Sequence, residues 1–321
     1  MPSFRSRLVY VLMKNRNLLR FQLKRETWDW DTSIPAFRQQ CEQGASGVKL
    51  PDGVQAVPEV IEGVTGIQGR RAEWLVPEGA ADGKVILYTV GGGYVSGSVS
   101  DHRALVAKLT RGSGIRTLLF DHRLAPEDPY PAALEDAVGA YRWLLASGVR
   151  PENILVAGES AGGGLCLATL LAIRDQSLPL PAAAVAISPW TDLALTGDSY
   201  RSRLEMSIDP PGMSTVCSKY YAGGQDTRLP WMSPLYGDLR GLPPLLICVG
   251  TYETMLDDST SFAEKARAAG VDVTLRAWEG MIHCFPLLAP LFPEASQALA
   301  EICAFVRCRL GLGAAEPVPQ A

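Results

Sequence analysis

Ser160 is the residue whose surroundings most clearly suggest chemistry. It stands at the centre of a G-x-S-x-G pentapeptide at residues 158–162, between an apolar run at 154–157 and a stretch of helix-forming residues. A strand, a tight turn and a helix in this order hold a serine hydroxyl exposed above a sheet, where it can act as a nucleophile. A serine that only caps the helix after an ordinary turn is the alternative interpretation.

A nucleophilic serine needs a general base, and the chain has only three histidines, at positions 102, 122 and 283. In folds that carry this pentapeptide, the order along the chain is serine, acid, histidine. Only His283 follows Ser160, so His283 is the predicted base. His102 and His122 precede the serine and are assigned structural roles.

The acid is expected between Ser160 and His283, after the apolar run at residues 245–249. Glu253 is nearest to the end of that predicted strand, whereas Asp257 and Asp258 are placed to cap a helix that begins near residue 260. The position predicts Glu253 as the acid, with Asp257 as the alternative.

A run of three glycines at residues 91–93 provides a candidate site for a developing negative charge. It follows the apolar strand predicted at 85–89 and precedes a helix that starts near Asp101. Glycines have no Cβ, so their backbone N–H groups can approach a substrate oxygen and form an oxyanion hole. A phosphate-binding loop is disfavoured because the lysine of a P-loop is absent and G-x-G-x-x-G is not satisfied.

The elements that must position these residues alternate along the chain. Apolar runs without polar alternation predict buried strands, and the stretches between them have helical spacing, so we expect an α/β fold with a mostly parallel sheet covered by helices. The predicted strands are 59–65, 71–76, 85–89, 117–120, 154–157, 183–187, 245–249 and 271–275, and a last helix is predicted at about 294–310.

Two segments do not follow this alternation of predicted strands and helices. Residues 192–232 are irregular and rich in Pro, Gly and aromatic residues, which is typical of an inserted cap. Residues 1–25 carry seven Lys or Arg and no acidic residue, interleaved with apolar residues. This pattern fits a helix over the protein's own active site, a helix on a membrane surface or a transit peptide, and we favour the first. The predicted division is therefore cap helices at 1–50 and a catalytic domain at 51–321.

Composition excludes several classes of protein. With 30 Lys plus Arg against 34 Asp plus Glu, the formal net charge of −4 argues against a nucleic-acid partner bound through a broad basic surface. No apolar run approaches the ~20 residues that span a bilayer. Seven cysteines without a C-x-x-C pair predict free thiols in a reducing, cytoplasmic compartment and no metal site.

Over about residues 70–290 the chain resembles the hormone-sensitive-lipase-like branch, or family IV esterases, of the α/β-hydrolases. Residues 91–93 match the glycines of the family's H-G-G-G motif, D-H-R-L-A-P-E at 121–127 is similar to D-Y-R-L-A-P-E, and G-E-S-A-G-G at 158–163 is similar to G-D-S-A-G-G. S-P-W-T-D-L at 188–193 and G-M-I-H at 280–283 also resemble family stretches.

The resemblance implies a site and an architecture. It implies that the N–H groups of Gly92, Gly93 and Ala161 bind the oxyanion, and that the acid occupies the position of Glu253. It also implies a cap built from the N-terminal helices and the insertion, no cofactor, and a possible homodimer, since relatives often dimerise.

Departures from the family pattern affect the glycine loop. Val90 stands where the family has the histidine thought to steady this loop, and His122 replaces the usual tyrosine. The donors of the oxyanion hole are backbone groups, so we expect the hole to persist with weaker preorganisation.

The expected function is a serine carboxylic-ester hydrolase that acts on small-to-medium acyl esters or lactones through Ser160, Glu253, His283 and an acyl-enzyme. The alternatives are an acyltransferase or a lyase or cyclase with the same triad, and a binding protein like the gibberellin receptors, which have lost the catalytic histidine. Cap residues expected to shape an apolar pocket are Trp28, Trp30, Met206, Met213, Tyr220 and Tyr221.

Overall fold

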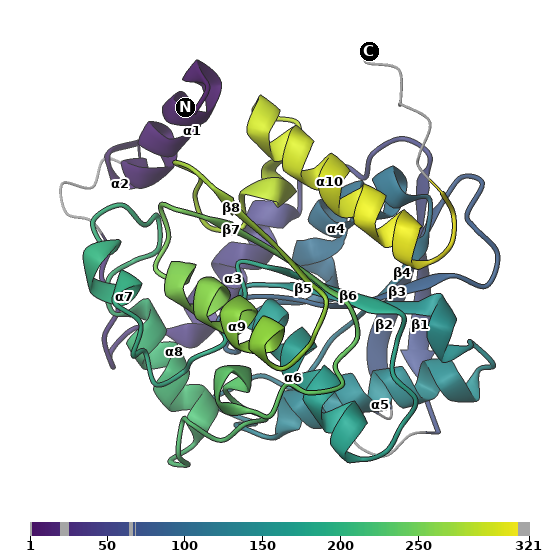
Figure 1. Cartoon of the computed structure of the whole chain (residues 1–321). Helices are drawn as coiled ribbons and strands as arrows, with labels where there is room; N and C mark the ends of the chain where they lie inside the picture. Colours follow the sequence, from purple (N-terminus) through teal and green to yellow (C-terminus); the bar gives the residue numbers. More distant parts are fainter. Residues whose placement is uncertain (1, 20–25, 64–66, 68, 314–321) are drawn as a thin grey trace.

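The protein is built on one twisted sheet. The computed structural model describes residues 2–19, 26–63, 67 and 69–313, and its eight-stranded sheet has the order β1-β2-β4-β3-β5-β6-β7-β8 (Figure 1). β1 and β2 are antiparallel to each other, β2 is antiparallel to β4, and the remaining pairs are parallel. The strands are β1 Val54–Ile61, β2 Arg70–Pro77, β3 Val85–Thr89, β4 Arg116–Phe120, β5 Ile154–Glu159, β6 Ala183–Ile187, β7 Leu245–Gly250 and β8 Val273–Trp278.

Helices cover both faces of this sheet. Side chains of α4 and α10 form one apolar core with one face, and side chains of α5, α6 and α9 form a second core with the other. The α/β fold with a mostly parallel sheet is thereby confirmed. The helices are α1 Phe4–Lys14, α2 Arg16–Leu19, α3 Ile34–Ala45, α4 Val99–Ser113, α5 Ala132–Ala146, α6 Ala161–Asp175, α7 Ser199–Ser202, α8 Met213–Ala222, α9 Leu256–Ala268 and α10 Pro293–Arg309.

The central strands are apolar on both faces because both faces are covered. Every residue of β3, β5, β6 and β7 is buried, as expected for parallel strands between two helical layers. Their carboxyl ends lie at the same edge of the sheet, as does that of β8. The glycine loop, Ser160, Glu253 and His283 each follow one of these strands, so the topology gathers them.

Three predicted boundaries were wrong. β1 begins at Val54 rather than at residue 59 because it pairs with β2 from Val54 opposite Pro77 onward, and its predicted end at 64–65 lies outside the described residues. β8 extends to Trp278, which pairs with Gly250. α9 begins at Leu256 instead of near residue 260.

The N-terminal segment and the 192–232 insertion pack against each other. The Trp28 backbone N–H donates to Pro211 O at 2.8 Å, and the ring of Trp30 meets that of Tyr220 edge-on at 5.8 Å. α1 and α2 lie at the same side of the molecule as α7 and α8 in Figure 1. Within the described ranges, no helix is both long and apolar enough to cross a membrane.

Candidate active site

Ser160 occupies a strained turn between β5 and α6. Its φ of 56° and ψ of −125° lie outside the regions that L-residues favour, which is the conformation of a nucleophile held above a sheet. The Ser160 N–H donates to Ile187 O of the neighbouring strand β6 at 2.9 Å. Its side chain caps no helix N–H. The turn therefore presents the hydroxyl instead of using it for capping.

Glu253 and His283 form a hydrogen-bonded acid–base pair. Glu253 Oε2 lies 2.6 Å from His283 Nδ1. The other oxygen, Glu253 Oε1, accepts from the Ser188 hydroxyl at 2.8 Å and from the Gly250 N–H at 2.6 Å. Glu253 is fully buried. These three contacts hold the carboxylate in one orientation.

Asp257, the alternative acid, is directed elsewhere. Its Oδ2 accepts from the Ser199 N–H at 2.9 Å, and Asp258 Oδ1 accepts from the N–H groups of Thr191 and Asp192 at 2.8 Å each. The prediction that these two aspartates cap α9 was wrong, because α9 starts before them. Their hydrogen bonds instead connect the start of α9 with the 192–232 insertion and the residue before it.

Ser160 and His283 line one cleft of about 250 Å³. The glycine loop forms another part of its wall, and the insertion contributes residues from α8 and the segment before it. Other lining residues are Trp190, Asp209, Met213, Cys217, Met255, Leu287 and Leu288. The cleft thus contains Ser160 and His283, and Glu253 is joined to it through its contact with His283.

The charge state of His283 reflects its burial and its neighbours. Burial by itself would lower its pKa, but negative charge at Cys284, Asp209 and Glu253 raises the pKa well above the ordinary imidazole value. We ascribe the rise to the two carboxylates, since burial raises the Cys284 thiol pKa to about 11 and leaves that thiol neutral near pH 7. Carboxylates near the ring stabilise the imidazolium that general-base catalysis creates.

The glycine loop presents backbone donors to the cleft. Gly92 and Gly93 have φ of 116° and 65°, values that favour glycine. Gly92 O accepts from the Ser96 N–H and hydroxyl, both at 3.0 Å, which fixes the loop from within. In the described structure the Gly92 and Gly93 N–H groups donate to no protein acceptor, and Ala161 starts α6, where an N–H has no intrahelical partner.

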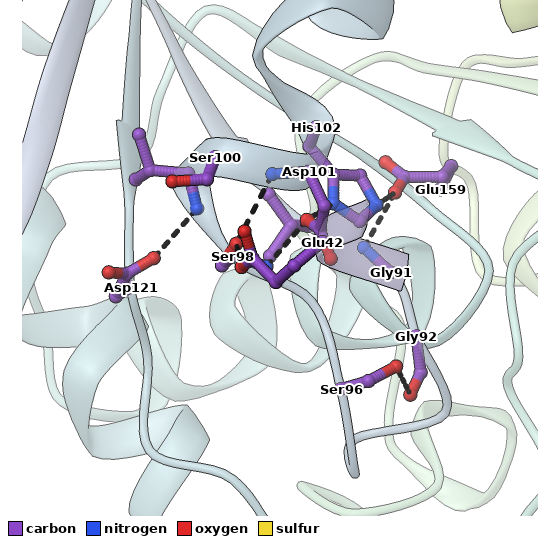
Figure 2. Close-up of polar contacts among 12 residues, drawn as sticks. Glu42, Gly91, Gly92, Ser96, Ser98, Ser100, Asp101, His102, Asp121 and Glu159 are labelled. Carbon is purple, nitrogen blue, oxygen red and sulfur yellow. Dashed lines mark hydrogen bonds and ion pairs between the residues drawn. The ribbon is translucent and has the colours of Figure 1, made fainter. Parts of the chain in front are cut away.

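A second charged group lies beside the nucleophile. Figure 2 shows His102 of α4 between Asp101 and Glu159. His102 Nε2 is 2.8 Å from Glu159 Oε1, and His102 Nδ1 contacts Asp101 Oδ1. Glu159 Oε1 also accepts from the Gly91 N–H at 2.6 Å (Figure 2).

Sequence reasoning left His102 among the structural residues, yet His102 and Glu159 line the cleft. The available signals were the acid immediately before the nucleophile and a histidine in the first turns of the helix after the glycine loop. Neither signal identifies the pairing, which depends on the fold bringing the first turn of α4 to Glu159 at the end of β5.

His122 and Val90 have local structural roles. His122 Nδ1 lies 3.0 Å from Arg123 O, and its Nε2 lies 3.5 Å from Val90 O. The Val90 side chain is buried in the core beneath α4 and α10 and brings no polar atom to the glycine loop. The loop therefore depends on other residues for polar anchoring.

Of the cap side chains expected to shape the pocket, Met213 lines the cleft. Trp28 packs edge-on against Phe37 at 4.8 Å, and Tyr221 stacks on Tyr94 at 3.7 Å, so both belong to the core. Trp30 is 58% exposed. The aromatic residues thus mainly bind the cap together.

No group of three or more His, Cys, Asp or Glu side chains that could hold a metal occurs within the described ranges. All seven cysteines are free thiols, and of these only Cys308 is exposed.

Together the eight-stranded sheet, the strained serine turn and the aligned acid and base define an α/β-hydrolase. A family model described as "alpha/beta hydrolase fold" matches residues 86–287. The acetyl-hydrolase of Streptomyces hygroscopicus is 44% identical over 75% of this chain and 81% of its own length. The putative acetyl-hydrolase LipR of Mycobacterium tuberculosis is 35% identical over 85% of this chain and 86% of its own length.

Solved structures agree with these relatives. A crystal structure of an esterase from the bacterial hormone-sensitive lipase family is 39% identical, with a TM-score of 0.87, and covers 97% of this chain and 100% of its own. The esterase EstE5, in a crystal soaked with p-nitrophenyl butyrate, is also 39% identical, with a TM-score of 0.87 over 96% of this chain and 99% of its own. The chain therefore belongs to the hormone-sensitive-lipase-like, or family IV, esterases of the α/β-hydrolase superfamily. It is an ester hydrolase.

Proposed function

We propose that the chain is a serine carboxylesterase that hydrolyses small-to-medium acyl esters, lactones included, through Ser160, Glu253 and His283. The observation that carries the proposal is the 2.6 Å contact between Glu253 and His283 at a cleft that also contains the strained Ser160. The proposed division assigns residues 1–50 and 192–232 to a cap and the remainder of 51–321 to the catalytic domain.

In the proposed mechanism, His283 accepts the hydroxyl proton of Ser160 while Oγ attacks the ester carbonyl. The N–H groups of Gly92, Gly93 and Ala161 donate to the oxyanion of the tetrahedral intermediate. His283 then gives its proton to the leaving alcohol, and an acyl-enzyme remains. Water attacks this acyl group with His283 again as base, and Ser160 regains its proton when the acid leaves.

Acyl, alcohol and lactone preferences are tested with a panel of p-nitrophenyl esters of graded acyl length and simple lactones. We expect the highest kcat/KM for short or medium chains, because the cleft is only about 250 Å³. Ser160→Ala is the control and is expected to lose turnover of every ester. Turnover that survives Ser160→Ala would contradict the proposal.

The same panel tests the alternative chemistries. Product analysis in the presence of added alcohols or amines distinguishes hydrolysis from acyl transfer, and products formed without water uptake would indicate a lyase or cyclase. A ligand-binding protein without turnover is disfavoured by the intact acid–base pair of Glu253 and His283.

We also propose that α1 contacts a lipid surface. Phe4, Leu8, Val11 and Leu12 recur at helical spacing and are 81%, 48%, 51% and 44% exposed, forming an apolar stripe on the outer face of α1. The side chains of Arg5 and Arg7 are exposed in the same helix, and the described residues 2–19 include no acid. An exposed apolar stripe with flanking basic residues favours an anionic membrane interface.

The inner face of α1 holds this stripe in place. The hydroxyl of Ser3 donates to Glu294 Oε2 at 2.8 Å, and Tyr10 packs edge-on against Tyr252 at 5.3 Å. Tyr252 precedes the proposed acid Glu253, so the lipid-facing helix lies close to the catalytic loops. Further basic residues at 20, 24 and 25 lie outside the described residues.

Vesicle sedimentation tests this contact. Wild-type protein should bind vesicles that contain phosphatidylglycerol more strongly than pure phosphatidylcholine vesicles, and the double variant Phe4→Ser/Leu8→Ser should lose the binding. Val57→Ser/Val60→Ser, at 45% and 49% exposed positions of β1, is the matched control. Equal sedimentation of both double variants would contradict the proposal. The proposal would also be contradicted if the wild-type protein were a dimer and only Phe4→Ser/Leu8→Ser made it monomeric. The apolar stripe would then be a homodimer contact.

A cytoplasmic location remains part of the proposal, supported by the seven free thiols.

A further inference from the structure

His102 carries a charge that the triad does not use. Its Nε2 lies 2.8 Å from Glu159 Oε1, and its Nδ1 contacts Asp101 Oδ1. An ionised carboxylate only accepts hydrogen bonds, so both ring nitrogens must carry protons to satisfy both contacts. Two carboxylate contacts on one ring favour an imidazolium at His102, and an imidazolium cannot act as a base.

The carboxylate that this cation holds also holds the glycine loop. Glu159 Oε1 accepts from the Gly91 N–H at 2.6 Å. A Cβ added at Gly91 would lie 2.8 Å from both Glu159 O and Glu159 Oε1, so the loop is pressed directly onto this residue. Glu159 is bonded covalently to Ser160. One carboxylate oxygen thus connects the nucleophile turn, α4 and the loop of the oxyanion donors.

We propose that His102 is a positioning residue for ester hydrolysis: it orients the Glu159 carboxylate, which fixes the glycine loop relative to Ser160. The inference rests on the proposed function, in which the N–H groups of Gly92 and Gly93 bind the oxyanion. Because Val90 brings no polar atom to this loop, the contact with Glu159 is the polar anchor of its first glycine.

Burial explains why Glu159 needs a cationic partner. Glu159 is 3% exposed, and its Oε2 has no hydrogen-bond partner in the described structure. An ionised carboxylate is costly in such a place unless a positive charge compensates it. Without the imidazolium, rotation of the carboxyl group would release the Gly91 N–H. The loop would then lose its fixed distance from Ser160.

Asp101 completes the arrangement from α4. Its Oδ1 accepts from the Ser98 N–H at 2.7 Å, and the Ser98 hydroxyl accepts from the Asp101 N–H at 3.2 Å, a capping box that starts α4 (Figure 2). This places His102 in the first turn of the helix. The orientation of the imidazolium is thus set by the helix start, independently of substrate.

The ionisation of His102 agrees with this geometry. Burial by itself would lower its pKa, but Glu159 and Asp101 raise the pKa to about 10. Tyr88 of β3 also lies near Glu159. The pKa of Tyr88 is raised, mainly by burial and in addition by the negative charge of Glu159. Cys41 of α3 lies near Asp101, with a pKa raised to about 11 mainly by burial. Both groups are neutral near pH 7 and therefore add no charge beside the imidazolium.

Steady-state kinetics with p-nitrophenyl butyrate test the role of His102. His102→Gln removes the charge and one donor, and kcat should fall by about 10- to 100-fold, less than the 10²- to 10³-fold typical of losing a whole oxyanion donor. KM should change by less than about threefold if the effect is confined to the transition state. Arg103→Gln removes a cation of the same helix that pairs with Glu73 but does not line the cleft; it is the matched control and should retain kcat within about threefold on the same reasoning.

A double-mutant cycle separates positioning through Glu159 from an independent effect. Glu159→Gln should lower kcat about as much as His102→Gln, and the double variant should lose little more, because the two residues act in series. Additive losses would overturn the proposal, as would an unchanged kcat in His102→Gln or an effect on KM alone.

A measurement on the wild-type enzyme guards against variants that fail to fold. The ¹⁵N shifts of His102 should report two protonated ring nitrogens from pH 6 to pH 9, and a neutral ring at pH 7 would overturn the proposal. Ser160→Ala distinguishes a failure of the proposed esterase function from a failure of the positioning role of His102. If that variant retains turnover, the proposed function fails; if it is inactive while His102→Gln retains its kcat, only the positioning role fails.

Discussion

Glu253 Oε2 lies 2.6 Å from His283 Nδ1, whereas Asp257, four residues further along the chain, accepts a hydrogen bond from the Ser199 N–H. The two acids that the sequence left as candidates therefore have different structural environments. The first is fully buried and held by Ser188 and Gly250. The second joins the insertion to α9.

This difference predicts a large loss of activity when Glu253 is replaced and little change when Asp257 is replaced. Glu253→Gln should lower kcat by about 10³- to 10⁴-fold, because the imidazole loses its orienting acceptor and the imidazolium loses its counter-charge. Asp257→Asn should retain kcat within about tenfold, since its partner is a backbone N–H remote from the reacting atoms. Steady-state kinetics of both variants, with thermal unfolding as a check on folding, measure the contrast. The reverse ranking would mean that Asp257 is the acid.

Asp209 predicts a shift in the pH profile. Burial lowers the His283 pKa, but nearby negative charge, including that of Asp209, raises it overall. A protonated His283 cannot accept the Ser160 proton, so kcat/KM should fall as the pH falls through this raised pKa. Asp209→Asn removes a charge that favours the imidazolium, so the fall should move to lower pH.

The exposed carboxylate of Asp198 provides the control for that shift. Its replacement, Asp198→Asn, should leave the acidic limb of the kcat/KM profile in place. A shift of equal size in both variants would mean that overall charge, and not the proximity of Asp209 to His283, sets the profile.

The ion pair between Arg123 and the buried Asp136 predicts a loss of stability when Asp136 is replaced. Asp136 of α5 is fully buried and accepts from the Arg123 N–H at 2.7 Å and from its guanidinium. Asp136→Ala leaves Arg123 without its buried partner, which should lower the free energy of unfolding by about 3–5 kcal/mol.

Glu135 is the matched control because it also pairs with Arg123, at 2.8 Å, but its side chain is 53% exposed. Glu135→Ala should cost only about 0–1 kcal/mol. Urea unfolding measures both values, and equal losses would contradict the assignment of Asp136 as the buried anchor.

The cysteines predict a single reactive thiol. Burial raises the pKa of Cys41 and Cys284 to about 11 and that of Cys217 and Cys303 to about 12, which keeps these thiols protonated and slow to react. Cys308 is exposed. Iodoacetamide at pH 7.5 followed by peptide mapping should therefore label Cys308 first. Rapid labelling of Cys284 at the cleft would contradict this order.

Much of the site was predictable because its residues follow strands. Ser160 was identified from the apolar run before it and the helix-forming residues after it, and the scarcity of histidine left His283 as the only candidate behind it. Glu253 followed from its position next to the end of β7. Each inference used local sequence together with the order of elements in a parallel sheet.

The contacts of His102 were not predictable in the same way. Asp101 is its neighbour in the sequence, but Glu159 lies 57 positions further along and reaches it only because the fold brings the first turn of α4 to the end of β5. The start of α9 was misplaced for a related reason. Asp257 and Asp258 have the residue type of helix caps, yet tertiary hydrogen bonds to the insertion use their carboxylates. Residue type predicts a capping preference, and packing decides which donor is available.

The central claim is that Ser160 is the nucleophile and carries the acyl group. Rapid-quench mass spectrometry after mixing with p-nitrophenyl butyrate tests it most directly. We expect a transient butyryl adduct on the peptide that contains Ser160, no adduct in Ser160→Ala, and a longer-lived adduct in Glu253→Gln. A butyryl group on another residue, or full turnover with Ser160 replaced by alanine, would contradict the account.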